Sequence, residues 1–185
     1  MVEIRGSLEL GWKSILGMTL SIILLASFVP PGFALDNFKT FSGDDFLAIT
    51  KTPELQLGHF TVEVRFRISG DPSERGYLVS KGSAANGSLF ADQNYALFIT
   101  KLKSIGGGFR STDGSYNYIY SPPVSTRSWH VANLTYDGTI LSIAIDGLVV
   151  NSRSVSNLVD NTADGDLKIG ANANGEPDMF FVGDM

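Results

Sequence analysis

The clearest alternation of apolar and polar residues runs from Phe60 to Ile68, where Thr, Glu and Arg separate five apolar side chains. Successive side chains of a strand point to opposite faces, so this pattern predicts a half-buried strand with one face in a core. Shorter segments of the same kind predict further strands at residues 38–41, 46–50, 77–81, 95–102, 107–111, 117–120 and 167–170. Short strands at this spacing favour an all-β fold, an antiparallel sandwich of two sheets.

Two hairpins are predicted between Trp129 and Val150, because this segment contains the pairs Asp137-Gly138 and Asp146-Gly147 between residues that favour strands. A two-residue type I′ turn needs positive φ at both central positions, which Asp tolerates and Gly permits freely. Both pairs are therefore expected to form such turns within a three-stranded meander. Trp129 is expected in the core, where large aromatic residues contribute most.

The first 34 residues have the pattern of a secretory signal peptide. Arg5 and Lys13 precede an almost wholly apolar stretch from residue 15 to 29, and Gly32 and Ala34 supply small side chains before a cleavage site. We expect cleavage after Ala34, so that residues 35–185 form a domain that is secreted or held at the cell surface. The alternative is an uncleaved anchor, but the apolar stretch is shorter than the ~20 residues of a spanning helix.

Composition narrows the function classes. The formal net charge of −5 and the absence of a basic cluster argue against binding to nucleic acid. The chain has no cysteine and two histidines, His59 and His130, which gives little support to a thiolate zinc site or to serine–histidine catalysis. The 20 glycines and seven prolines suit many short strands joined by tight turns.

Three segments carry a resemblance to a known family: FSGDDFLAITKTPELQLGHFTVEVRF (41–66), WHVANLTYDGTILSIAIDGLVV (129–150) and LKIGANANGEPDMFFVGDM (167–185). In order and spacing, residues 36–185 resemble the laminin-G-like jelly rolls of the concanavalin A-like lectin and glucanase superfamily. The resemblance implies a jelly-roll sandwich and a non-catalytic module that recognises a carbohydrate or an extracellular protein partner. The alternative is a structural or accessory domain of a larger secreted protein or glycoside hydrolase.

One departure from that family concerns its last strand. Members usually continue past a segment like 180–185 into another strand that returns beside the opening strand, whereas this sequence stops at Met185. We therefore expect a fragment that lacks the last strand. The alternative is a sandwich with an unprotected edge.

Asp44 and Asp45 lie in a turn where the resemblance implies a structural calcium ion, which takes six to eight oxygen ligands. The alternative is a solvated turn, since Asp often stabilises turns through local hydrogen bonds. Calcium is the one cofactor that the sequence suggests. Two further segments, starting at Asn86 and Asn133, match the N-glycosylation pattern, and Asn86 is the better placed because it lies in a predicted loop.

The segment from Gly114 to Tyr120 places Tyr116, Tyr118 and Tyr120 on one side of a strand. Aromatic rings with polar tips suit ligand contact, so Tyr116 and Tyr118 are candidate ligand-binding residues. The same alternation is also typical of a strand that packs against a core, and the sequence leaves both alternatives open.

Glycoside hydrolysis is the rival function, because some proteins of the resembled fold are glycosidases. Those enzymes need two carboxylates about 5–10 Å apart, usually delivered by one strand. No strand here carries Asp and Glu at alternate positions, and residues 160, 164, 166, 176 and 178 are scattered through predicted loops, where a solvated role is expected. The chain is therefore expected not to be an enzyme.

Overall fold

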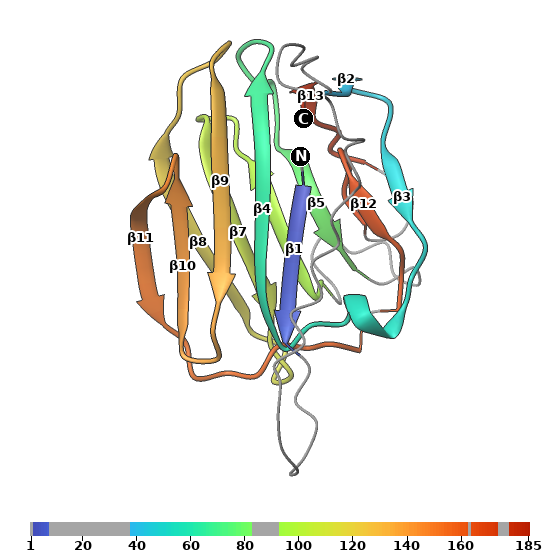
Figure 1. Cartoon of the computed structure of the whole chain (residues 1–185), viewed down its shortest axis with the longest axis vertical. Helices are drawn as coiled ribbons and strands as arrows, with labels where there is room; N and C mark the ends of the chain where they lie inside the picture. The colour runs from blue at the N-terminus through green and yellow to red at the C-terminus, as the bar shows by residue number, and fades with distance from the viewer. Residues whose placement is uncertain (1, 8–37, 83–92, 163, 174–177) are drawn as a thin grey trace, which may run out of the picture.

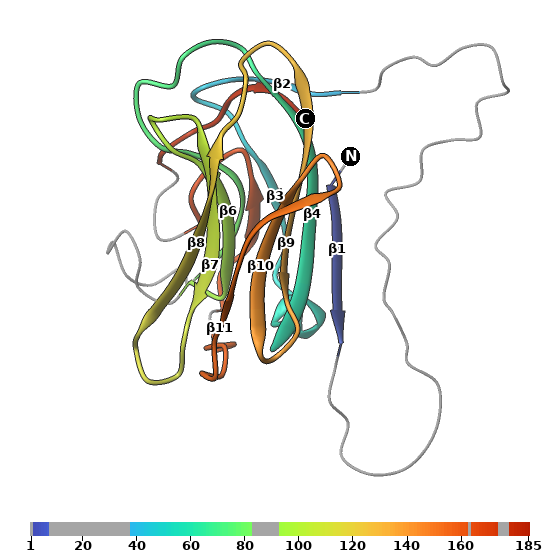
Figure 2. The same ribbon diagram turned by 90° about the vertical axis from the view of Figure 1, so that its left-hand side faces the viewer.

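The computed structural model describes residues 2–7, 38–82, 93–162, 164–173 and 178–185. Within these ranges the chain consists of antiparallel strands and a single short 3-10 helix, Pro53–Leu55. Two sheets lie face to face, as the edge-on view shows (Figures 1 and 2). The predicted all-β sandwich is confirmed. No helix in the described ranges has the length and hydropathy needed to cross a membrane.

The first sheet has the order β11-β10-β9-β4-β13-β2, with β1 also paired to β4. Its strands are β1 (Val2–Ser7), β2 (Thr40–Ser42), β4 (His59–Ile68), β9 (Trp129–Tyr136), β10 (Ile140–Ile145), β11 (Leu148–Ser154) and β13 (Val182–Asp184). The second sheet has the order β3-β12-β5-β6-β7-β8. Its strands are β3 (Leu47–Ile49), β5 (Gly76–Lys81), β6 (Tyr95–Ile99), β7 (Ser104–Arg110), β8 (Tyr116–Pro123) and β12 (Leu167–Ile169).

The main core fills the space between the sheets. On β4 the five apolar residues of the alternating segment are each at most 3% exposed, and the polar residues between them are half-buried. The second sheet supplies residues such as Leu97, Ile105 and Phe109 to the same cluster. The alternation from Phe60 to Ile68 was therefore a correct guide to the buried face.

The predicted meander forms, but only one of its two turns is as expected. At the β10–β11 turn Asp146 and Gly147 have φ of 53° and 81°, as a type I′ turn requires. At the β9–β10 turn β9 ends at Tyr136 and β10 begins at Ile140, so three residues make the connection. The Asp137 carboxylate there accepts hydrogen bonds from the backbone N–H groups of Thr139 and Ile140, at 2.8 and 2.7 Å. These side-chain bonds stabilise a wider loop, so the two-residue prediction was wrong at this turn.

Trp129 does not join the core, so that prediction was wrong. On β9 the even-numbered residues Ala132 and Leu134 are buried in the core. Trp129 is odd-numbered, so it lies half-buried on the outer face of the first sheet. The Arg65 guanidinium lies 4.1 Å from the centre of its ring, and Phe38 meets the ring edge to face at 5.6 Å. The Trp129 ring is thus covered by the guanidinium and the apolar stem of an arginine, and not by core side chains.

Strands β1 and β13 share one edge of β4, opposite β9. β13 pairs Gly183 with Ile68 and Asp184 with Arg67, and β1 continues in the same direction from the pair Val2–Val64 to the pair Ser7–His59 (Figure 1). Residues 2–7 belong to the expected signal peptide, and residues 8–37 lie outside the described part of the chain. Cleavage after Ala34 stays a prediction.

Candidate functional site

The tyrosines of β8 face away from the main core. Asn117, Ile119 and Ser121 are buried at alternate positions, whereas Tyr116 and Tyr120 are 46% and 42% exposed. Tyr118 is half-buried between them. Together with Tyr77 of β5 and Phe98 of β6, whose side chains are fully buried, they lie on the outer side of the second sheet. We refer to these five residues, Tyr77, Phe98, Tyr116, Tyr118 and Tyr120, as the aromatic face.

The packing of the Phe98 ring in the aromatic face depends on a glycine of β7, Gly106. Strand register puts Tyr77, Phe98, Gly106 and Tyr120 in one row across β5, β6, β7 and β8. A Cβ atom at Gly106 would lie 2.4 Å from the Phe98 ring, so a residue with a side chain would push that ring off the sheet. The Phe98 ring instead lies against β7 and meets the rings of Tyr118 and Tyr120 edge to face, at 5.8 and 6.0 Å.

The tyrosine side chains are held in place. The Tyr118 hydroxyl donates a 2.5 Å hydrogen bond to Gln93 Oε1, and the rings of Tyr116 and Tyr118 are nearly parallel at 6.2 Å. Burial raises the pKa of Tyr118, and burial also raises the pKa of Tyr77. Both hydroxyls therefore stay protonated at neutral pH, and the Tyr118 hydroxyl acts as a hydrogen-bond donor.

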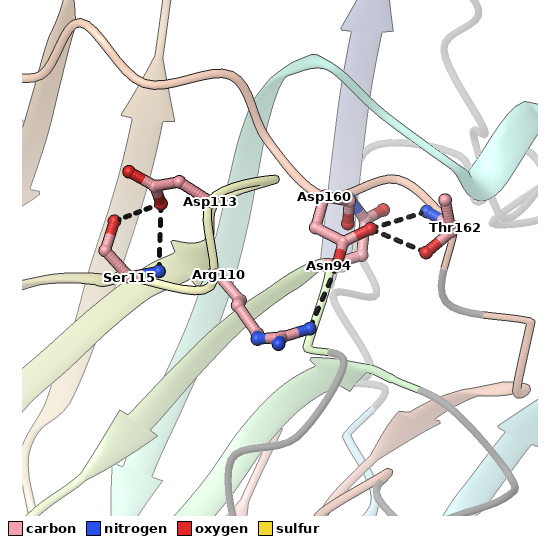
Figure 3. Close-up of polar contacts among 6 residues, drawn as sticks. All are labelled: Asn94, Arg110, Asp113, Ser115, Asp160 and Thr162. Atoms are coloured by element: carbon pink, nitrogen blue, oxygen red, sulfur yellow. Dashed lines mark hydrogen bonds and ion pairs between the residues drawn. The ribbon is translucent and has the colours of Figure 1, made fainter.

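An arginine lies at each end of the aromatic face. Arg75, half-buried, directly precedes β5 and places its guanidinium 4.4 Å from the centre of the Phe98 ring. At the other end Arg110 is the register partner of Tyr116 and donates a 3.1 Å hydrogen bond to Asp160 Oδ2 (Figure 3). The Asp160 side chain is 13% exposed, so the predicted solvated role was wrong for this residue. Its partner Arg110 offsets the desolvation of its charge.

Asp160 also fixes the loop around it. Its Oδ1 accepts hydrogen bonds from the backbone N–H and hydroxyl of Thr162, at 3.2 and 2.6 Å, and its carbonyl accepts one from Asn94 (Figure 3). In the adjacent β7–β8 turn, Asp113 accepts two hydrogen bonds from Ser115, which lower the pKa of its carboxyl group. Both carboxylates thus stabilise the loops beside the aromatic face.

Asp44 and Asp45 are close together in the turn after β2. Asp45 pairs with the Lys39 ammonium and accepts a 2.9 Å hydrogen bond from the Ser42 backbone, and both interactions lower its pKa. Asp44 accepts a 2.8 Å bond from the Ser42 hydroxyl. The lysine occupies the place of a cation at Asp45, which does not suit calcium as arranged. The described residues contain no group of three or more His, Asp or Glu side chains placed to hold a metal ion. Calcium binding stays a prediction.

The two glycosylation candidates differ in what the structure describes. Asn86 lies outside the described residues. Asn133 lies in the middle of β9, between Glu63 of β4 and Ala144 of β10, and is half-buried on the outer face of the first sheet. Attachment at either position stays a prediction.

A cavity of about 320 Å³ lies at one end of the sandwich. Ile68, Ile99 and Phe181 contribute to its lining, together with Asp71 and Glu74 from the loop after β4. Asp71 pairs with Lys103 at 3.1 Å. Sequence reasoning missed this cavity, because its lining comes from segments far apart in the chain and no local pattern marks it.

The model of one protein family matches residues 41–185, and its description is the concanavalin A-like lectin/glucanases superfamily. The chain belongs to this superfamily. The superfamily assignment agrees with the resemblance stated from the sequence and with the observed sandwich. No curated protein matches the chain in sequence.

Several solved structures of this superfamily's fold are similar to the chain. The CBM40 of Ruminococcus gnavus IT-sialidase, bound to α2,3-sialyllactose, has a TM-score of 0.67 at 18% identity, covering 80% of this chain and 87% of that one. Leech intramolecular trans-sialidase has a TM-score of 0.66 at 14% identity, with 80% and 24% covered. Domains LG4-5 of the mouse laminin α1 chain have a TM-score of 0.56 at 16% identity, with 78% and 38% covered. At these identities the similarity establishes the fold.

Proposed function

We propose that the chain is a non-catalytic carbohydrate-binding module, secreted or displayed at a cell surface, that holds a sugar against the aromatic face. The observation that carries this proposal is the exposure of Tyr116 and Tyr120 on the outer side of the second sheet. Aromatic rings usually bury their apolar faces, whereas these two side chains are 46% and 42% exposed and carry polar hydroxyl groups.

The chemistry of the aromatic face suits a sugar ring. The C–H groups of a pyranose pack on an aromatic ring, and its hydroxyl groups need donors and acceptors at the edge of that ring. The polar tips of the exposed Tyr116 and Tyr120 are such groups, and the hydrogen bond from Tyr118 to the buried Gln93 fixes the ring between them. Because Phe98, Gly106 and the hydrogen bond to Gln93 hold the rings in place, little side-chain entropy is lost on binding.

The carboxylates of the described residues support the non-catalytic part of the proposal. Hydrolysis of a glycosidic bond needs an acid and a second carboxylate on either side of the substrate. The strands β5, β6, β7 and β8 contain no Asp or Glu, and the nearby Asp113 and Asp160 hold loops in place. An accessory role beside a catalytic domain is the alternative, which fits the 24% share of the leech trans-sialidase chain that is covered.

The neighbours in fold support the same class of ligand. The CBM40 of Ruminococcus gnavus IT-sialidase was solved with bound α2,3-sialyllactose, and another neighbour consists of domains LG4-5 of the mouse laminin α1 chain. Secretion rests on the signal-like pattern of residues 1–34. A protein partner on the same face is the outcome to expect if no glycan binds.

The proposal is tested by screening the full chain on a glycan array and measuring the affinity of each hit by titration calorimetry. Tyr116→Ala and Tyr120→Ala should each weaken binding about five- to thirtyfold, because stacking contacts contribute about 1–2 kcal/mol. Phe38→Ala is the matched control, since Phe38 is equally exposed, at 42%, on the first sheet. An array without any hit, or equal losses in the control, would overturn the proposal.

A further inference from the structure

The strands under the aromatic face differ in charge from the rest of the chain. The chain has 19 acidic residues and a net charge of −5, yet none of the acidic residues lies in β5, β6, β7 or β8. The charged residues of these strands are Lys81 and Arg110. Lys81 is buried and donates to the carbonyl of Gly165, and Arg110 is paired with Asp160. A negatively charged ligand on this face therefore meets no carboxylate from the strands beneath it.

Arg75 directly precedes the first of these strands, β5. Its guanidinium lies over the Phe98 ring and is close enough to Tyr77 to affect the pKa of the Tyr77 hydroxyl. The ring fixes the plane of a half-buried guanidinium, which is the group that best matches the two oxygens of a carboxylate. Since the side chain is already ordered, binding an anion costs it little further entropy.

Two acidic residues lie close to this end of the aromatic face. Glu74 is exposed and lines the cavity at the end of the sandwich. Asp178 acts on Tyr77 through its charge, and its Oδ1 accepts a 2.8 Å hydrogen bond from Asn172. Neither residue belongs to the strands that carry the aromatic face.

We propose that the sugar held by the aromatic face carries a carboxylate group, and that Arg75 binds this carboxylate. The proposal rests on the carbohydrate-binding function above and narrows it to acidic sugars. The rings of Tyr116 and Tyr120 then supply the stacking surface, and Arg75 supplies the charge that separates an acidic sugar from a neutral one of the same shape.

The test compares ligands that differ only in that charge. The full chain is titrated with α2,3-sialyllactose and its methyl ester, and with an oligogalacturonate and its methyl ester. At least one acid should bind about tenfold or more tightly than its ester, because a charge-assisted hydrogen bond contributes about 1.5–3 kcal/mol. Arg75→Gln should remove this preference, and Arg75→Lys should keep part of it.

The matched control is Arg127→Gln, which removes the same charge from an exposed loop residue before β9. It should leave the preference for the acid unchanged. Equal affinity for acid and ester, or an unchanged preference in Arg75→Gln, overturns the role of Arg75. In that case neutral sugars that still bind on the array leave the carbohydrate-binding function in place, whereas an array without hits removes both proposals.

Discussion

The two outer faces of the sandwich use the same residue types in opposite ways. On the first sheet Arg65 and Arg67 both lie over the Trp129 ring, at 4.1 and 5.0 Å, and Arg67 is also paired with Asp184 at 2.7 Å. On the second sheet the arginines stand at the two ends, and the outermost tyrosine rings remain open.

Strand register explains this difference. Arg67 is directly opposite Trp129 on the neighbouring strand, so its long side chain reaches across the ring. On β7 the residues opposite Tyr118 and Tyr120 are Gly108 and Gly106, which have no side chain to cover a ring. The arginines thus cover the Trp129 ring of the first face, whereas Tyr116 and Tyr120 of the second face are 46% and 42% exposed.

The largest effect should come from adding a side chain at Gly106, beneath the rings of the aromatic face. Gly106→Ala places a Cβ atom 2.4 Å from the Phe98 ring. We expect the free energy of unfolding to fall by about 1–3 kcal/mol and glycan affinity to be lost, because the ring must move. Urea unfolding and calorimetry measure the two effects. Gly58→Ala is the control, because nothing lies within 4 Å of the added Cβ atom, and it should change neither stability nor affinity. Normal glycan binding by Gly106→Ala would contradict the role of Gly106.

The opposite face should respond only in stability. Trp129→Ala removes a half-buried ring and its contacts with two arginines, so the free energy of unfolding should fall by about 1–2 kcal/mol. Glycan affinity should stay within about twofold of that of the unchanged chain, because Trp129 lies on the outer face of the first sheet, away from the aromatic face. A loss of affinity as large as that of Tyr116→Ala would show that the two faces are not separate.

A smaller effect concerns pH. Burial raises the pKa of Tyr118 above its ordinary value of 10.0 in the folded chain, so the unfolded chain loses this proton first as pH rises. The contribution of Tyr118 to stability should therefore be constant below about pH 10 and should decrease above it. In Tyr118→Phe the decrease should be shallower, though not absent, because burial raises the pKa of Tyr77 and Tyr95 in the same direction. Urea unfolding at pH 8 to 11 tests this, and an unchanged slope would contradict it.

The sequence predicted what depends on local alternation. One side of β4 is buried and the other is not, so the alternation from Phe60 to Ile68 identified the core face directly. On β8 the alternation showed that Tyr116, Tyr118 and Tyr120 share a side, but it did not show which side faces the core. On β5 and β6 every residue is buried, so these strands have no alternation from which to place Tyr77 or Phe98.

Pairings between distant segments could not be predicted. Asp160 and Arg110 are 50 residues apart, and nothing local to either residue indicates that they form an ion pair. The position of Trp129 outside the core depends on its register with Arg67 across two sheet strands. The contribution of Gly106 depends on the Phe98 ring of a neighbouring strand, so from the sequence this glycine was one of 20.

The alignment of β13 and β1 along β4 has a consequence for the exposed backbone of the first sheet. Arg67 pairs with Asp184 and Val64 with Val2, so two positions of β4, Phe66 and Arg65, separate these pairs. The two short strands thus occupy most of the hydrogen-bonding groups on the side of β4 that faces away from β9. Backbone groups engaged in this way offer no template on which a strand of another chain could pair.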